Sequence, residues 1–95
     1  MQQLELFPDV LDKAKEIING DREKDYGPAD ANFAAIAQMW SAYLSMRLGV
    51  HVELTSKDVA HIMALLKIAR LAKTPDHEGS VVDGIGYLAL SPRCR

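Results

Sequence analysis

The sequence predicts an all-α fold, a compact domain of four helices. Apolar residues recur at helical spacing in four segments, at about 8–19, 28–48, 56–73 and 80–90. The connections between these segments are short, which favours antiparallel neighbours in a helical bundle. Only residues 49–54 alternate between apolar and polar side chains. We reject a strand there, because no second strand is available to pair with it and a lone strand is not stable.

The length and the composition of the chain are those of one globular domain covering residues 1–95. Of its 95 residues, 48% are apolar and 25% are charged. The net charge of −2 disfavours direct binding to a nucleic-acid duplex, which requires a basic face. A small anionic ligand, by contrast, needs only two or three well-placed cations.

The sequence also bears on disulfide bonds and on the cellular compartment. The single cysteine, Cys94, allows no disulfide within the chain. The N-terminal residues lack the basic region of a signal peptide, and no apolar run reaches the ~18 residues of a membrane span. We therefore expect a cytoplasmic protein without a membrane partner.

The first two helices are defined by proline and glycine at their ends. Pro8 suits the first turn of a helix over about 8–19, because its missing N–H would have no partner there. The second helix, over about 28–48, is expected to end at Gly49. Trp40 lies in the middle of its apolar stripe and is predicted to anchor the core.

The last two helices begin with capping patterns. Residues 55–58, Thr-Ser-Lys-Asp, predict a capping box that opens the helix over 56–73. The apolar stripe of that helix is wide, which indicates burial on more than one side or a partner subunit. Residues 80–83, Ser-Val-Val-Asp, repeat the pattern at the start of the helix over 80–90. Residues 76–78, Asp-His-Glu, match no zinc pattern and are interpreted as a loop.

The most polar stretch of the sequence, residues 20–28, lies between the first two helices and carries five consecutive charges. Its three carboxylates could coordinate a divalent cation, and its two cations could instead hold a phosphate. A solvated loop whose charges compensate one another is the simpler alternative. The residues concerned are Asp21, Arg22, Glu23, Lys24 and Asp25.

Further polar residues interrupt the apolar faces of the later helices. Lys67 and Arg70 lie three apart on one helical face, where they either reach solvent or face a polar pocket. Asp83 is expected to cap its helix and could also pair with Lys67 or Arg70. Asp58 and His61 could bind a metal or exchange a proton, although the capping role of Asp58 is the simpler interpretation.

Three segments together resemble a family of small uncharacterised proteins from phages and prophages. They are residues 19–28 (Asn-Gly-Asp-Arg-Glu-Lys-Asp-Tyr-Gly-Pro) followed by Asn-Phe at 32–33, residues 65–71 (Leu-Leu-Lys-Ile-Ala-Arg-Leu), and residues 82–87 (Val-Asp-Gly-Ile-Gly-Tyr). The resemblance covers about residues 10–90. The Lys-Asp-Tyr-Gly segment and the later Lys-x-x-Arg helix are distantly similar to phage domains associated with nucleotide modification. The helical layout is also similar to the MazG-like fold of all-α nucleotide pyrophosphohydrolases.

The resemblance to the pyrophosphohydrolases stops at their metal site. Those enzymes bind Mg²⁺ through a Glu-x-x-Glu motif on one helix and Glu-x-x-Asp on a later one, and this sequence has neither. Asp83 alone falls roughly where the later acid would lie. Because two-metal hydrolysis requires such carboxylates, no catalytic residue, metal site or cofactor is assigned.

We therefore expect a helical protein that recognises a nucleotide or another phosphorylated ligand by binding rather than turnover. Arg22, Lys67 and Arg70 would contact phosphate, and Tyr26 would stack on a base. The full set of expected ligand-binding residues is Arg22, Asp25, Tyr26, Asn32, Lys67, Arg70, Asp83 and Tyr87.

Two other functions stay open at this point. One is a protein interaction module that acts on a host factor through the wide apolar stripe of 56–73. The other is a divergent Mg²⁺-dependent pyrophosphohydrolase, which would use Asp21, Asp25, Asp58 and Asp83. A homo-oligomer is expected in any case, because four helices of this length leave apolar surface uncovered.

Overall fold

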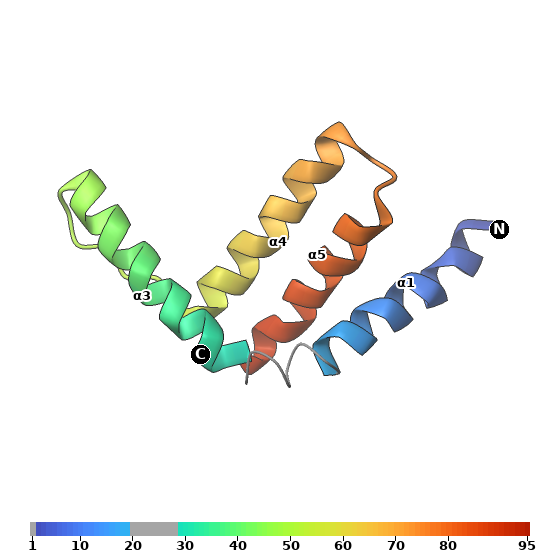
Figure 1. The fold of residues 1–95 in the computed structure, drawn as a ribbon, viewed down its shortest axis with the longest axis horizontal. Coiled ribbons are helices and arrows are strands. Elements are labelled where there is room, and N and C mark those ends of the chain that lie inside the picture. The colour runs from blue at the N-terminus through green and yellow to red at the C-terminus, as the bar shows by residue number, and fades with distance from the viewer. Residues whose placement is uncertain (1, 20–28) are drawn as a thin grey trace.

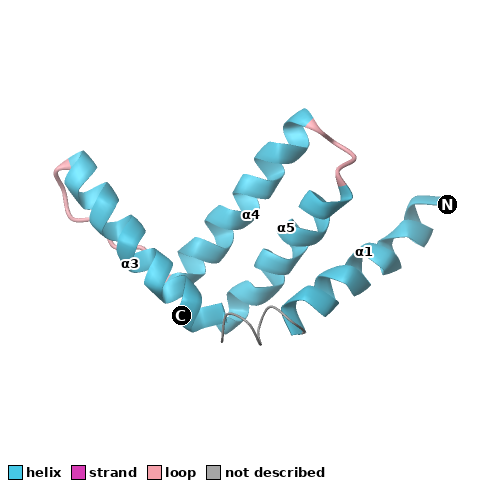
Figure 2. Cartoon of the chain, in the orientation of Figure 1, coloured by secondary structure: helices cyan, strands magenta, loops and turns pink. Residues whose placement is uncertain are grey.

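A computed structural model describes residues 2–19 and 29–95, and every regular element in that part of the chain is helical (Figures 1 and 2). The elements are α1 (Gln2–Asn19), α3 (Ala29–Leu48), α4 (Ser56–Lys73), α5 (Glu78–Leu90) and a short 3₁₀ helix, η1 (Ser91–Arg93). The predicted all-α class is therefore confirmed for the described residues. Within this part, residues 49–54 form no strand, as expected.

The helices form a flat, open layer rather than the compact bundle that we predicted. α4 and α5 form a hairpin, α1 packs on α5, and α3 packs against α4 but diverges from it (Figure 1). The molecule measures 51 × 31 × 19 Å, and its radius of gyration is 15.1 Å. A compact domain of this length would have a radius of gyration of about 12 Å. The α3 helix therefore projects from the body formed by the other helices.

The core lies where the start of α3, the start of α4 and the end of α5 meet. Its buried members are Phe33, Ala37, Val59, Ala60 and Cys94. Trp40, the predicted anchor, is only half-buried and packs against the edge of this cluster. Burial raises the pKa of the Cys94 thiol. Cys94, to which we assigned no role from its sequence position, is thus a core residue.

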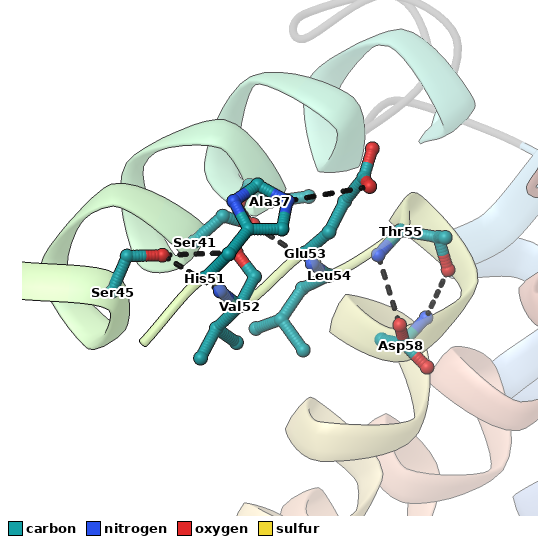
Figure 3. Close-up of polar contacts among 9 residues, drawn as sticks. All are labelled: Ala37, Ser41, Ser45, His51, Val52, Glu53, Leu54, Thr55 and Asp58. Atoms are coloured by element: carbon teal, nitrogen blue, oxygen red, sulfur yellow. Dashed lines mark hydrogen bonds and ion pairs between the residues drawn. The ribbon is translucent and has the colours of Figure 1, made fainter. Parts of the chain in front are cut away.

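Two predicted helix ends are confirmed. The Thr55 hydroxyl accepts from the Asp58 N–H at 3.2 Å, and an Asp58 carboxylate oxygen accepts from the Thr55 N–H at 2.9 Å (Figure 3). This reciprocal capping box satisfies two backbone donors at the start of α4. Gly49 follows the end of α3 with a φ of 71°, in the left-handed region that glycine adopts without strain.

The segment after α3, residues 50–54, runs back along that helix, and two serines hold it there (Figure 3). Ser41 accepts from the Leu54 N–H at 2.8 Å. Ser45 accepts from the Val52 N–H at 2.9 Å and donates to the Val52 carbonyl at 3.1 Å. We call residues 50–54 the return segment. The serine hydroxyls of α3 thus form hydrogen bonds with backbone groups of the return segment, as a second strand would in a sheet.

Two predicted helix starts are wrong. α1 begins at Gln2, not near Pro8, because the residues before the proline are mostly good helix formers such as Gln, Leu and Glu. α5 begins at Glu78 rather than at Ser80. Its N-cap is His77, whose side chain accepts from the Ser80 N–H at 3.1 Å. The imidazole therefore takes the capping role that we had assigned to the serine, and Asp83 is no longer at a capping position.

Candidate functional site

A groove lies between the end of α4 and the start of α5. Its volume of about 440 Å³ is within the range of pockets for small organic ligands. The lining residues come from the last turns of α4, the connecting loop and the first turn of α5. They are Leu66, Ala69, Arg70, Lys73, Thr74, His77 and Ser80.

Two cations line this groove. Arg70 and Lys73 lie three apart on α4, so their side chains leave the same face of the helix. Both are exposed, and neither forms an ion pair with any residue in the described part of the chain. Their place in the last turn of α4 is favourable, because the C-terminal end of a helix carries partial negative charge. The helix can therefore hold two cations here without an acidic partner.

His77 is held in one orientation at the start of α5. The Ser80 N–H can only donate, so His77 Nδ1 must accept it, at 3.1 Å. The Ser80 hydroxyl then donates to the same nitrogen at 2.8 Å. Because Nδ1 accepts both bonds, the neutral ring carries its proton on Nε2. A Cβ at Gly79 would lie 3.1 Å from the His77 ring, so glycine gives the ring room in this position.

Lys67 and Asp83, which we expected at a ligand site, instead pair with each other. Lys67 Nζ lies 3.2 Å from an Asp83 carboxylate oxygen, and the two side chains are only 14% and 21% exposed. The pair joins the middle of α4 to α5. The alternative that Asp83 pairs with Lys67 is thus confirmed, and both groups are engaged in holding the helices together.

The other expected site residues do not line the groove. Asn32 is exposed on α3, and Tyr87 is half-buried with its ring centroid 6.1 Å from that of Phe33. Tyr87 follows Ser80 by seven helical residues, a distance of about 10 Å along α5. Of the five expected residues that the structure describes, Arg70 alone is among those that line the groove. Arg22, Asp25 and Tyr26 lie outside the described residues.

The carboxylates that the structure describes do not come together as an acidic site. Asp58 is occupied by the capping box, and His61 is exposed on the same helix. Among residues 9–17 and 30–95, no three His, Cys, Asp or Glu side chains lie close enough together to hold a metal ion. Asp21 and Asp25, the other carboxylates of the hydrolase alternative, fall outside the described residues. In the described helices there is no stretch long and apolar enough to cross a membrane.

Comparison with known proteins places the chain among phage sequences. Residues 9–95 match a family described as a domain of unknown function, DUF6378. The chain is 49% identical over 81 residues to the Gene 55 protein of Mycobacterium phage L5, covering 85% of this chain and 49% of that protein. It is 40% identical over 84 residues to the Gene 55 protein of Mycobacterium phage D29, covering 88% of this chain and 52% of that protein. The chain thus spans about half the length of these relatives. No solved structure matches it.

Proposed function

We propose a function for this protein, which belongs to the DUF6378 family of phage proteins, from the geometry of its groove. In this proposal it recognises a nucleotide or a similar small phosphorylated molecule in the host cytoplasm, by binding rather than turnover. The observation that supports this most directly is the pair of cations, Arg70 and Lys73, that lines the groove without acidic partners in the described residues.

The chemistry of the lining suits a phosphorylated ligand. The Arg70 guanidinium can donate two parallel hydrogen bonds to a phosphate, and Lys73 adds a second positive charge one turn away. His77 contributes a neutral Nε2–H donor. Leu66 and Ala69 supply apolar surface for the ring of a base or sugar. Charge recognition and ring packing are therefore available within one groove.

The lining supports binding more than hydrolysis. Among the described residues that line the groove there is no carboxylate that could hold a metal ion on the phosphate, and no cysteine. Asp83, which a hydrolase of this layout would use, is already paired with Lys67. Turnover is therefore not part of the proposal.

Isothermal titration against a panel of linear and cyclic nucleotides, at concentrations up to about 1 mM, tests the proposal. We expect Arg70→Ala and Lys73→Ala each to weaken binding by roughly tenfold or more, because each removes a charge-assisted contact. Helical circular dichroism and the thermal midpoint should stay unchanged, since both side chains are exposed. The affinity should also fall as salt is added.

Lys57→Ala is the matched control. Lys57 is likewise exposed on α4, but it lies in the first turn, far along the helix from the groove. The Lys57→Ala variant should bind nucleotides with the affinity of the native chain. The proposal fails if no nucleotide of the panel gives heat at these concentrations. It also fails if Arg70→Ala binds as tightly as the native chain.

A second candidate function, a module that binds a host protein, rests on a different observation. Large apolar side chains are exposed on α3 and α4, among them Tyr43, Met46 and Leu65. The two candidates depend on different residues. A host protein whose binding is lost in Tyr43→Glu but kept in Arg70→Ala would support the second candidate, and the reverse pattern would exclude it.

A further inference from the structure

The outer face of α3 carries an apolar stripe that nothing in the described chain covers. Met39, Tyr43 and Met46 lie at i, i+4 and i+7, so they share one side of the helix. They are 71%, 66% and 87% exposed. Leu48 and Val50, at the tip of the helix, are also mostly exposed. Leu48 comes nine residues after Met39 and leaves the opposite side of the helix, so we call only Met39, Tyr43 and Met46 the α3 stripe. Contiguous apolar surface of this kind marks an interaction site.

The composition of α3 indicates that the stripe is normally buried. Among its 20 residues only Asp30 and Arg47 are charged. The inner face packs on the core through Phe33 and Ala37, and the outer face is apolar as well. A helix that carries apolar side chains on two opposite faces is stabilised when both faces are covered. In this chain, α4 and the return segment cover only part of α3.

The flat shape of the molecule also indicates that the α3 stripe is normally buried. The helices lie side by side in one layer, and the thinnest dimension is 19 Å (Figure 1). Protein domains are built from at least two packed layers of secondary structure around a core. A second layer is therefore needed, and the projecting α3 offers the surface on which to build it.

We propose that a second copy of this chain covers the α3 stripe, through antiparallel pairing of the two α3 helices about a twofold axis near Tyr43. A twofold contact must be self-complementary, because the same patch serves both subunits. The stripe meets this condition, since it contains no charge that would repel its own copy. With the axis between Ala42 and Tyr43, Met39 faces Met46 of the partner subunit, and methionine adapts readily to such a surface.

The α3 stripe can supply about half of the surface that a dimer buries. From the exposed fractions of its three residues, about 400 Å² is available on each copy. A stable interface buries about 800 Å² on each partner, and the flanking side chains of α3 can supply the difference. The groove between α4 and α5 lies on other helices, so this proposal does not depend on the proposed ligand.

Sedimentation equilibrium of the native chain tests the proposal, with a dimer expected at concentrations of about 100 μM. Tyr43→Glu should weaken dimerisation by at least tenfold, because it buries a carboxylate against its own copy near the axis. The helical circular dichroism should remain, since Tyr43 is exposed in the single chain. Leu11→Glu is the matched control, because Leu11 is 51% exposed but lies on α1. This variant should remain a dimer.

A cross-linking experiment tests the position of the axis. Two cysteines at position 43 would lie close together beside the axis, so Tyr43→Cys should form a disulfide-linked dimer on mild oxidation. Leu11→Cys should not, and the native Cys94 is only 4% exposed and should stay reduced. A native chain that is monomeric at these concentrations would overturn the proposal, and a protein other than this chain would then cover the stripe. A Tyr43→Glu variant that dimerises like the native chain would also overturn it.

Discussion

Asp30 shows how one carboxylate can connect three parts of the chain. It lies in the first turn of α3 and accepts from the Ser56 hydroxyl at 2.6 Å, at the start of α4. It also accepts from the Arg95 N–H at 3.0 Å. These hydrogen bonds, the one from Ser56 above all, favour the ionised carboxylate and lower the pKa of Asp30.

The lowered pKa of Asp30 predicts a pH-dependent contribution to stability. The contribution should be fully present above the unfolded pKa of about 4 and should be lost as the pH falls toward the lower folded pKa. Asp30→Asn should therefore be less stable than the native chain at pH 7, and the difference should shrink below about pH 4. Urea unfolding at several pH values from 7 to 3 measures the free energy of unfolding of both proteins as a function of pH. Parallel curves for the two proteins would contradict this account.

The ion pair between Lys67 and Asp83 is expected to contribute to the stability of the fold. Asp83→Asn leaves the mostly buried Lys67 ammonium without its charged partner, and should lower the free energy of unfolding by about 1–3 kcal/mol. The double variant Lys67→Met, Asp83→Leu should recover most of that loss, because it removes both charges. Chemical denaturation of the native chain, the single variant and the double variant measures the three free energies of unfolding. Asp83→Asn as stable as the native chain would show that the pair does not hold α4 to α5.

At the scale of the elements, the return segment depends on serines of α3. Ser45→Ala removes the acceptor of the Val52 N–H and the donor to the Val52 carbonyl. The variant should lose about 1–2 kcal/mol of stability, mostly by local opening of the return segment. Hydrogen exchange at the Val52 amide should become faster, while Gln38→Ala, an exposed change on the same helix, should leave it unaffected. Unchanged exchange in Ser45→Ala would contradict the role of this hydroxyl.

The helices were predictable where the chain signals its own local structure. Thr55 and Asp58 are typical capping residues at the right spacing, and Gly49 is a typical helix stop. The start of α5 was missed because histidine is not among the favoured N-cap residues, whereas Ser80 is. The role of Ser45 was missed for another reason. A serine inside a helix looks like any surface residue until the chain that returns along it is known.

The candidate site was predictable only in part, because it depends on packing between helices. Arg70 was identified from its place in an apolar stretch. Lys73 continues the same row, and that spacing was the signal that could have added it. His77 joins the groove only because it caps α5, which the sequence pattern does not reveal. Lys67 and Asp83 were expected to bind a ligand or to pair, and the structure shows the ion pair, which joins two helices.

At the scale of the whole molecule, the wide apolar stripe of α4 predicted burial on more than one side. In the single chain that burial is incomplete. Leu65 and Ile68 are 61% and 56% exposed, and the α3 stripe adds to this uncovered surface. A molecule of this shape gains stability from any partner that binds the folded state alone, because binding shifts the folding equilibrium. Association and folding should therefore be measurable together.

The thermal midpoint of the native chain should accordingly rise with protein concentration. If two folded chains associate and unfolded chains do not, a tenfold increase in concentration should raise the midpoint by about 4 °C for a dimer of this length. Scanning calorimetry from about 10 μM to 1 mM covers two such steps. Tyr43→Glu should show a midpoint independent of concentration, because its folded chain has lost the contact, whereas Leu11→Glu should follow the native chain. A native midpoint that does not change across this range would mean that the single layer of helices is stable alone.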